Sequence, residues 1–245
     1  MFPYKIQAVQ SLLPTDYQSR LNYAMRFEQL ARDNAYFLSH LIMSDETHFY
    51  LNGFVNKQNA RFWGSDNPRN TIQHRLHSPK CTVWCGIMTE RIIGPYFFED
   101  EEGHPERVTG ALYRTMIENF LLPEVAGNQQ VWFQQDGATA HTADLTMALL
   151  RDIFNDRLIS RNADFPWPPR SPDLTAHDYF LWGYLKERVY VNNPQTIAEL
   201  KENILAEVRQ IEPDVLNSVM ENALQRAIIC KQENGGHLKD IIFHT

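Results

Sequence analysis

The fold is decided by a stretch with the sequence Val131-Trp132-Phe133-Gln134-Gln135-Asp136-Gly137. Residues 131–134 predict a short buried strand that leads to Asp136. Residues 143–152 then show helical spacing, and a second short apolar run follows at 158–160. A strand, a helix and another strand in this order predict a parallel crossover unit and place the chain in the α/β class.

Upstream of this unit, the pattern predicts a helix at 15–34 that begins at Thr15. Apolar runs predict strands at 37–44, 82–88 and 92–98, the last two forming a hairpin, and a helix follows at 109–122. Residues 48–53 could form a further strand, and 56–79 is a long polar connection of the functional or mobile kind.

Downstream, residues 165–172 carry closely spaced prolines, which lack amide donors and restrict their predecessors. A helix can therefore begin only afterwards, at about 175–189. Two amphipathic helices at 195–210 and 213–231 are expected to pack on the sheet. Together these elements predict one α/β domain with a mixed sheet.

Composition places limits on the function. Of 245 residues, 43% are hydrophobic and 22% charged, which is ordinary for a globular chain. Lys and Arg number 23 against 30 Asp and Glu, and the net charge of −7 counts against tight DNA binding by charge alone. The sequence has neither the roughly 20 continuous apolar residues of a membrane helix nor a signal peptide, which predicts a soluble intracellular protein.

The cysteines do not suggest a disulfide framework. The three are Cys81, Cys85 and Cys230, an odd number that suits a reducing compartment. Cys81 and Cys85 fall on one face of an expected buried strand. No second Cys or His pair at finger spacing accompanies them, so we interpret them as core residues and not as zinc ligands.

Acidic residues at the boundaries of elements are the candidates for chemistry. Asp45 is expected to end a strand, Asp136 ends another, and Asp178 opens a helix. Carboxylates at strand ends tend to face a crevice, and three of them would favour Mg²⁺ or Mn²⁺. Local interpretations stay open: Asp45 could cap a turn, Asp136 could form a turn with Gly137, and Asp178 could belong to a capping box with Thr175.

These aspartates lie in three blocks that occur in a fixed order. The blocks have the sequences Ser44-Asp45-Glu46-Thr47-His48-Phe49, Trp132-Phe133-Gln134-Gln135-Asp136-Gly137-Ala138-Thr139-Ala140-His141-Thr142, and Trp167-Pro168-Pro169-Arg170-Ser171-Pro172-Asp173-Leu174-Thr175-Ala176-His177-Asp178-Tyr179-Phe180-Leu181-Trp182. They resemble the signature blocks of mariner-type DNA transposases. The resemblance runs from about residue 3 to 245 and includes the segment Gly235-Gly236-His237-Leu238.

The resemblance implies a fold and a site. It implies an RNase H-like mixed sheet, in which a three-strand antiparallel meander is joined by parallel strands and flanked by helices. Asp45, Asp136 and Asp178 would be the catalytic residues and would bind two Mg²⁺ or Mn²⁺ ions, with Asp45 bridging both. The third acid falls on Asp178 and not on Asp173, and the interval after Asp136 is longer than in the best-known members of the family.

The resemblance also implies an activity and an organisation. We expect DNA strand cleavage and strand transfer in the nucleus, with transposon ends and target DNA as partners, a possible homodimer, and neither a membrane nor a small-molecule cofactor. The expected division is a linker and helix at 1–35, a catalytic domain at 36–192 with an inserted loop at about 53–79, and packed helices at 193–245. Such transposases carry helix-turn-helix modules ahead of this domain, and we expect this chain to lack them.

Two other functions stay open. One is a domesticated or degenerate transposase product that binds nucleic acid or protein without catalysis. The other is a nuclease of the same fold that acts on RNA–DNA hybrids.

Further side chains are secondary candidates. His141 could contact a phosphate or be structural, and Arg170 and Lys57 could contact the DNA backbone or be solvated surface. The tryptophans could include a base-stacking platform, although core packing is the simpler account for most of them: Trp63, Trp84, Trp132, Trp167 and Trp182.

Overall fold

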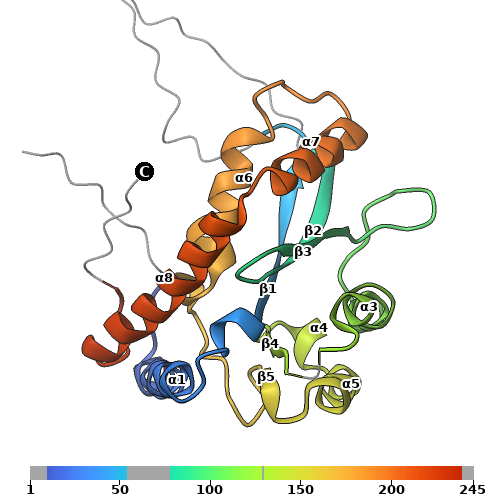
Figure 1. The fold of residues 1–245 in the computed structure, drawn as a ribbon. Coiled ribbons are helices and arrows are strands. Elements are labelled where there is room, and N and C mark those ends of the chain that lie inside the picture. Colours follow the sequence, from blue (N-terminus) through green and yellow to red (C-terminus); the bar gives the residue numbers. More distant parts are fainter. Residues whose placement is uncertain (1–9, 54–77, 129, 239–245) are drawn as a thin grey trace, which may run out of the picture.

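A computed structural model describes residues 10–53, 78–128 and 130–238, and this part of the chain forms a mixed sheet flanked by helices (Figure 1). The strands are β1 (Leu41–Tyr50), β2 (Lys80–Ile87), β3 (Ile92–Phe97), β4 (Trp132–Gln134) and β5 (Leu158–Ile159). They lie in the order β3-β2-β1-β4-β5. The first three form the antiparallel meander, and β4 is parallel to both β1 and β5. The sheet is that of the expected RNase H-like fold.

The helices occupy most of the expected positions. They are α1 (Pro14–Asp33), α2 (Gly110–Met116), α3 (Leu122–Val125), α4 (Thr139–Thr142), α5 (Asp144–Phe154), α6 (Trp182–Arg188), α7 (Ile197–Arg209) and α8 (Pro213–Gln232). A π-helical turn at Ile117–Leu121 joins α2 to α3, and another at His177–Leu181 leads into α6. No helix within the described ranges is long and apolar enough to cross a membrane.

The largest correction to the sequence interpretation concerns β1. A strand at 37–44 was expected to end at Asp45, and a further strand at 48–53 was left open. Instead, a short 3-10 turn at Leu38–His40 is followed by one strand that runs through Asp45 to Tyr50. Backbone pairing with β2 is continuous along this strand, with Asp45 opposite Cys85. The polar residues in the middle of β1 therefore do not end the strand. Their side chains alternate between the two faces of one continuous strand.

Two hydrophobic cores cover the two faces of the sheet. The larger packs α1, α6, α7 and α8 against one face, and the smaller packs α2 and α5 against the other. The helix α7 contacts β2 and β3 as expected, whereas α8 packs mainly along α1. Cys81, Cys85 and Cys230 are buried free thiols, as the core interpretation predicted. Lys57, Trp63 and most of the expected loop lie outside the described residues.

A buried arginine joins three segments that are far apart in the sequence. Arg20 of α1 is fully buried and donates to both carboxylate oxygens of Asp173, at 2.7 and 2.6 Å. It also donates to the Ser171 hydroxyl and to the Gly235 carbonyl, each at 2.8 Å. Gly235 has a φ of +80°, and a Cβ there would lie 1.9 Å from the Tyr17 carbonyl oxygen, so only glycine fits. This Arg20 network holds in place the loop that precedes Asp178.

Candidate active site

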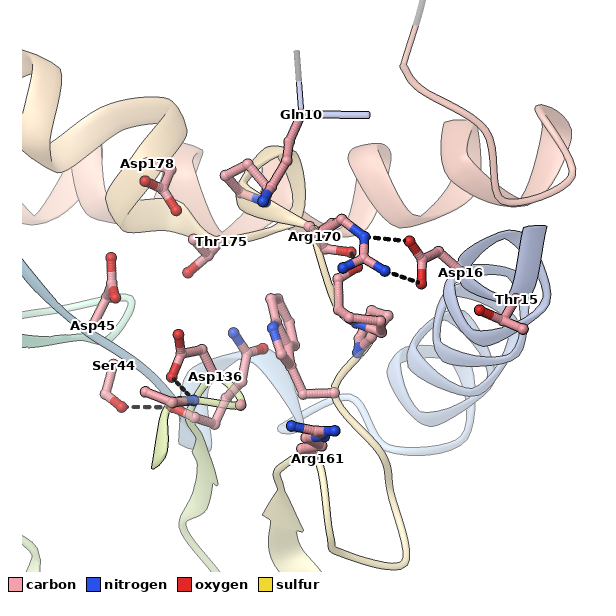
Figure 2. Close-up of a pocket in the computed structure, with 18 residues that line it drawn as sticks. Gln10, Thr15, Asp16, Ser44, Asp45, Asp136, Arg161, Arg170, Thr175 and Asp178 are labelled. Atoms are coloured by element: carbon pink, nitrogen blue, oxygen red, sulfur yellow. Dashed lines mark hydrogen bonds and ion pairs between the residues drawn. The ribbon is translucent and has the colours of Figure 1, made fainter. Parts of the chain in front are cut away.

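The three aspartates line one cavity of about 670 Å³ (Figure 2). Asp45 comes from β1, Asp136 follows the end of β4, and Asp178 lies in the π-helical turn before α6. The adjacent parallel strands β1 and β4 are also joined by Ser44, whose hydroxyl donates to the Gln134 carbonyl at 2.7 Å. This arrangement brings together side chains that are distant in the sequence, since Asp45 and Asp178 are more than 130 residues apart.

Asp45 carries a carboxyl group whose pKa is perturbed by its surroundings. Burial and then the negative charge of Asp178 raise its pKa well above the usual value, with smaller contributions from Glu46 and Asp136. One opposing contact is a hydrogen bond of 2.8 Å from the Trp182 indole to Oδ2. Negative charge is thus concentrated around a partly buried carboxyl group, an imbalance that a bound cation would relieve.

Asp178 is exposed to the cavity, and its pKa is also raised. Partial burial and then the charges of Asp136 and Asp173 bring this pKa to about 6, although Lys186 opposes the shift. Lys186 donates to the Thr47 hydroxyl at 3.3 Å, and burial lowers its own pKa. A single lysine therefore compensates part of the negative charge on this side of the cavity.

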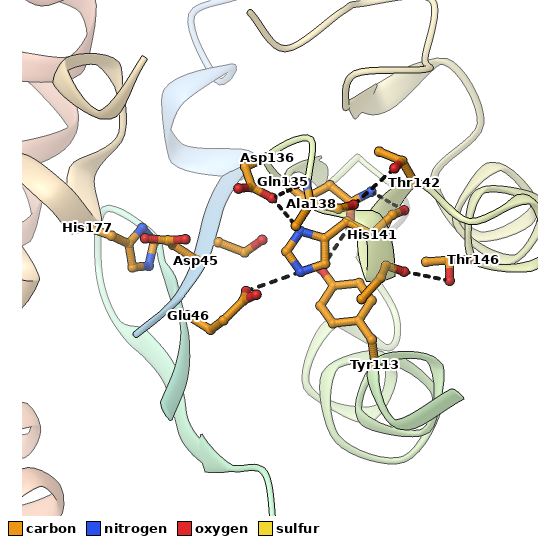
Figure 3. Close-up of polar contacts among 12 residues, drawn as sticks. Asp45, Glu46, Tyr113, Gln135, Asp136, Ala138, His141, Thr142, Thr146 and His177 are labelled. Atoms are coloured by element: carbon orange, nitrogen blue, oxygen red, sulfur yellow. Dashed lines mark hydrogen bonds and ion pairs between the residues drawn. The ribbon is translucent and has the colours of Figure 1, made fainter. Parts of the chain in front are cut away.

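Asp136 is held by His141, which in turn contacts Glu46 (Figure 3). The His141 Nδ1 atom donates to Oδ1 of Asp136 at 2.6 Å, and Nε2 forms an ion pair of 3.1 Å with Oε2 of Glu46. Burial would lower the pKa of His141, but its contacts with Asp136 and Glu46 raise it to about 10. The pKa of Asp136 is lowered. Burial would raise it, but the hydrogen bond and the charge of His141 outweigh this effect. An imidazolium therefore bridges two carboxylates.

Neighbouring side chains fix this bridge. The His141 ring lies against the Tyr113 ring with centroids 4.2 Å apart. The Tyr113 hydroxyl donates to Oε1 of the fully buried Gln135 at 2.9 Å. Gln135 Nε2 donates to the His141 carbonyl and to the Ser160 hydroxyl, each at 3.0 Å. The segment after β4 is thus tied to α2 and to the end of β5.

Several of these groups were not predicted from the sequence. Glu46, Tyr113, Gln135 and Trp182 were not assigned a role at the site, although Glu46 and Gln135 lie directly beside two of the aspartates in the sequence. The alternation of side chains along a strand was the available signal for Glu46, because it places the neighbour of Asp45 on the opposite face. For Tyr113 and Trp182 there was no comparable signal, since their partners are distant in the sequence.

The local interpretations of the aspartates fare differently. Asp45 lies within β1 and so does not cap a turn. No side-chain capping bond begins the turn that holds Asp178, and the Thr175 hydroxyl is buried without a hydrogen-bond partner among the described residues. Asp136 does form a local turn, because its Oδ1 accepts from the Ala138 amide at 2.9 Å. Asp136 therefore forms this turn and lines the cavity at the same time.

The secondary candidates are mostly structural. Arg170 pairs with Asp16 at 2.6 Å in the cavity wall, so its charge is already compensated. Four of the tryptophans are buried, as the core interpretation predicted: Trp84, Trp132, Trp167 and Trp182. His141 is buried between carboxylates, which favours the structural role over direct phosphate contact.

The donor atoms of the cavity fit a hard divalent ion. Asp45 and Asp136 each use one carboxylate oxygen in hydrogen bonds to described residues, which leaves the second oxygen of each for a ligand. Carboxylate oxygens are the donors that Mg²⁺ and Mn²⁺ prefer. Within the described part of the chain, however, no three His, Cys, Asp or Glu side chains are grouped closely enough to hold an ion as they stand.

The mixed sheet and its flanking helices define an RNase H-like α/β fold. This fold is that of the Mos1 mariner transposase catalytic domain. The crystal structure of that domain has a TM-score of 0.73 and 18% identity, and the match covers 95% of this chain and 100% of that one.

Two further Mos1 structures are similar as well. The Mos1 transposase paired-end complex with the left transposon end has a TM-score of 0.79 and 18% identity, covering 98% of this chain and 68% of that chain. The Mos1 catalytic domain with Raltegravir and Mn has a TM-score of 0.72 and 17% identity, covering 94% and 100%. No protein-family model and no curated protein matches the sequence.

Proposed function

We propose that this chain is the catalytic domain of a mariner-type DNA transposase, which cleaves DNA strands and joins the freed 3′ end to target DNA. The observation that carries the proposal is the cavity lined by Asp45, Asp136 and Asp178 in a chain with the Mos1 fold. Further support comes from the Mos1 structures, which were solved with transposon ends, with Mn or Mg, and as a strand transfer complex.

The three aspartates would be the residues that hold two Mg²⁺ or Mn²⁺ ions. When bound, such ions supply an activated water and stabilise the leaving oxygen of an in-line displacement. The protein's own side chains orient the ligands, because Trp182 holds one oxygen of Asp45 and His141 holds one oxygen of Asp136. This chemistry needs no covalent intermediate on the protein.

The proposal extends to partners and organisation. Transposon-end and target DNA would be the partners, a homodimer would form, and the protein would act in the nucleus. The proposed division of the chain is a linker and helix at 1–35, a catalytic domain at 36–192 and packed helices at 193–245.

The test is Mn²⁺-dependent nicking of supercoiled DNA by the purified chain. We expect nicking by the wild type, none by Asp136→Ala, and wild-type nicking by Asp152→Ala, which removes an exposed acid of α5 outside the cavity. Nicking that survives Asp136→Ala contradicts the assigned site.

Two further measurements distinguish the alternatives. A folded chain that binds DNA but neither nicks it nor binds Mn²⁺ by calorimetry would establish the non-catalytic binding module instead. Cleavage of an RNA–DNA hybrid with duplex DNA left intact would establish the hybrid nuclease.

A further inference from the structure

The two carboxylate oxygens of Asp136 have different surroundings. Oδ1 accepts hydrogen bonds from His141 Nδ1 at 2.6 Å and from the Ala138 amide at 2.9 Å. Oδ2 accepts none from the described residues, and 47% of the Asp136 side chain is exposed. With Oδ1 saturated, Oδ2 is the oxygen available to a ligand in the cavity.

The donor that saturates Oδ1 has little freedom to move. His141 is 1% exposed, lies against Tyr113, and has its other ring nitrogen 3.1 Å from Oε2 of Glu46. Figure 3 shows the imidazole between the carboxylates of Asp136 and Glu46, with Tyr113 beneath it. Nδ1 is hydrogen-bonded to Asp136 and Nε2 lies within ion-pair distance of Glu46, so rotation of the ring would break both contacts.

The acceptor on the far side of His141 comes from the strand that carries Asp45. Asp45 and Glu46 are consecutive in β1, so their side chains leave opposite faces of the strand. Asp45 lines the cavity, while Glu46 reaches His141. The contacts from Glu46 through His141 to Asp136 thus connect the strand that carries Asp45 to Asp136, and both of these aspartates line the cavity.

From this geometry we infer that His141 and Glu46 are a positioning pair that presents Oδ2 of Asp136 to a divalent metal ion. Glu46 lies 3.1 Å from Nε2, on the side of the ring opposite Asp136, and so fixes the orientation in which Nδ1 meets Oδ1. The inference rests on the proposed function in that it takes Asp136 as a metal ligand. Partners that orient a metal ligand typically contribute about 10- to 100-fold to metal affinity or activity.

Two amide variants of nearly equal size separate positioning from simple packing. The side-chain nitrogen of His141→Asn replaces Nδ1 and retains the bond to Asp136, whereas that of His141→Gln replaces Nε2 and retains only the contact with Glu46. The readout is Mn²⁺ affinity of the DNA-free chain, measured by electron paramagnetic resonance of free Mn²⁺. Thermal unfolding in EDTA verifies that each variant is folded.

We expect His141→Gln to weaken Mn²⁺ binding by about tenfold and His141→Asn by less than about threefold. Equal affinities for the two folded variants would overturn the inference, because a packing role would not depend on which nitrogen is replaced. A second variant, Glu46→Gln, keeps the shape of a partly buried side chain and weakens its contact with Nε2 by replacing the carboxylate with an amide. It should weaken Mn²⁺ binding by about threefold, and unchanged affinity would contradict the role of Glu46.

Failure of the inference and failure of the proposed function have different signatures. Wild-type chain that binds no Mn²⁺ and nicks no DNA defeats the proposed function and, with it, this role for His141. Wild-type chain that binds Mn²⁺ and nicks DNA, with His141→Gln equal to wild type in both, defeats only the positioning pair.

Discussion

The indole Nε1 of Trp182 donates a hydrogen bond of 2.8 Å to Oδ2 of Asp45, joining the first residue of α6 to the middle of β1. Trp182 is 4% exposed, and its ring packs edge-on against Phe49 with centroids 6.2 Å apart. A core aromatic residue thus also orients a carboxylate of the candidate site. The hydrogen bond from its nitrogen can be tested separately from the packing of its ring.

Replacing Trp182 by Phe should remove the donor and keep most of the ring packing. We expect the unfolding free energy to fall by about 1 kcal/mol, because a partly buried carboxyl group loses its hydrogen bond, and the Mn²⁺ affinity to fall as well. Urea denaturation and calorimetry measure the two effects. Trp84→Phe is the matched control, since Trp84 is buried in the other core and its Nε1 has no hydrogen-bond partner within the described ranges. Equal Mn²⁺ affinity in the two variants would refute an orienting role.

Two glycines with nearly the same backbone conformation should respond very differently to alanine. Gly235 has a φ of +80° and Gly103 a φ of +82°, but only at Gly235 would a Cβ collide with the Tyr17 carbonyl oxygen. Gly103→Ala should cost about 1 kcal/mol for the positive φ alone. Gly235→Ala should cost more than about 3 kcal/mol, because α1 and the turn after α8 must separate. Urea denaturation of both variants tests the difference, and similar losses would argue against this close approach.

The Arg20 network should dominate the stability of the loop before Asp178. Arg20→Met leaves the Asp173 carboxylate without its bidentate partner, and we expect a loss of about 4 kcal/mol in unfolding free energy. Arg32→Met removes an arginine of the same helix whose side chain is 70% exposed, and it should cost less than about 1 kcal/mol. Chemical denaturation distinguishes the two. A small loss for Arg20→Met would mean that water replaces its contacts.

The raised pKa of Asp178 predicts how stability depends on pH in the absence of divalent ions. Its pKa is about 6 in the folded chain and about 3.9 in an unfolded one, so the folded state takes up the proton first as the pH falls. Ionised Asp178 therefore destabilises the fold above pH 6, and this cost disappears by about pH 4. The Asp178→Asn variant should melt at a higher temperature than wild type at pH 8 in EDTA, and at the same temperature near pH 4. A constant difference between pH 4 and pH 8 would contradict the shift.

The parts of the fold that depend on local pattern could be predicted. The crossover unit of β4, α5 and β5 follows from two short apolar runs around an amphipathic helix, and α7 and α8 follow from their spacing. The continuity of β1 could not be predicted, because a polar stretch from Ser44 to His48 resembles a break until β2 is known to pair with it. The π-helical turn at His177–Leu181 also escaped prediction, since its hydrogen-bond pattern has no periodicity distinct from that of an α-helix.

For the candidate site, residue spacing alone left the aspartates open to local explanations. The resemblance of the three blocks selected Asp45, Asp136 and Asp178, and the structure places all three along one cavity. The groups that surround them depend on long-range contacts, such as that between Asp45 and Trp182 across 137 positions. Such pairings follow from packing of the whole domain and leave no trace in local sequence.

The unbroken course of β1 has a consequence for insertions and deletions. Because Asp45 and Glu46 face opposite sides of one strand, an added or lost residue between Leu41 and Ser44 that shifts the pairing with β2 by one position would exchange their faces. A shift by two positions would restore the alternation while moving both acids along the strand. Whether the pairing shifts by an odd or an even number of positions thus decides which carboxylate faces the cavity. Insertions or deletions of one residue here should therefore be far less tolerated than substitutions.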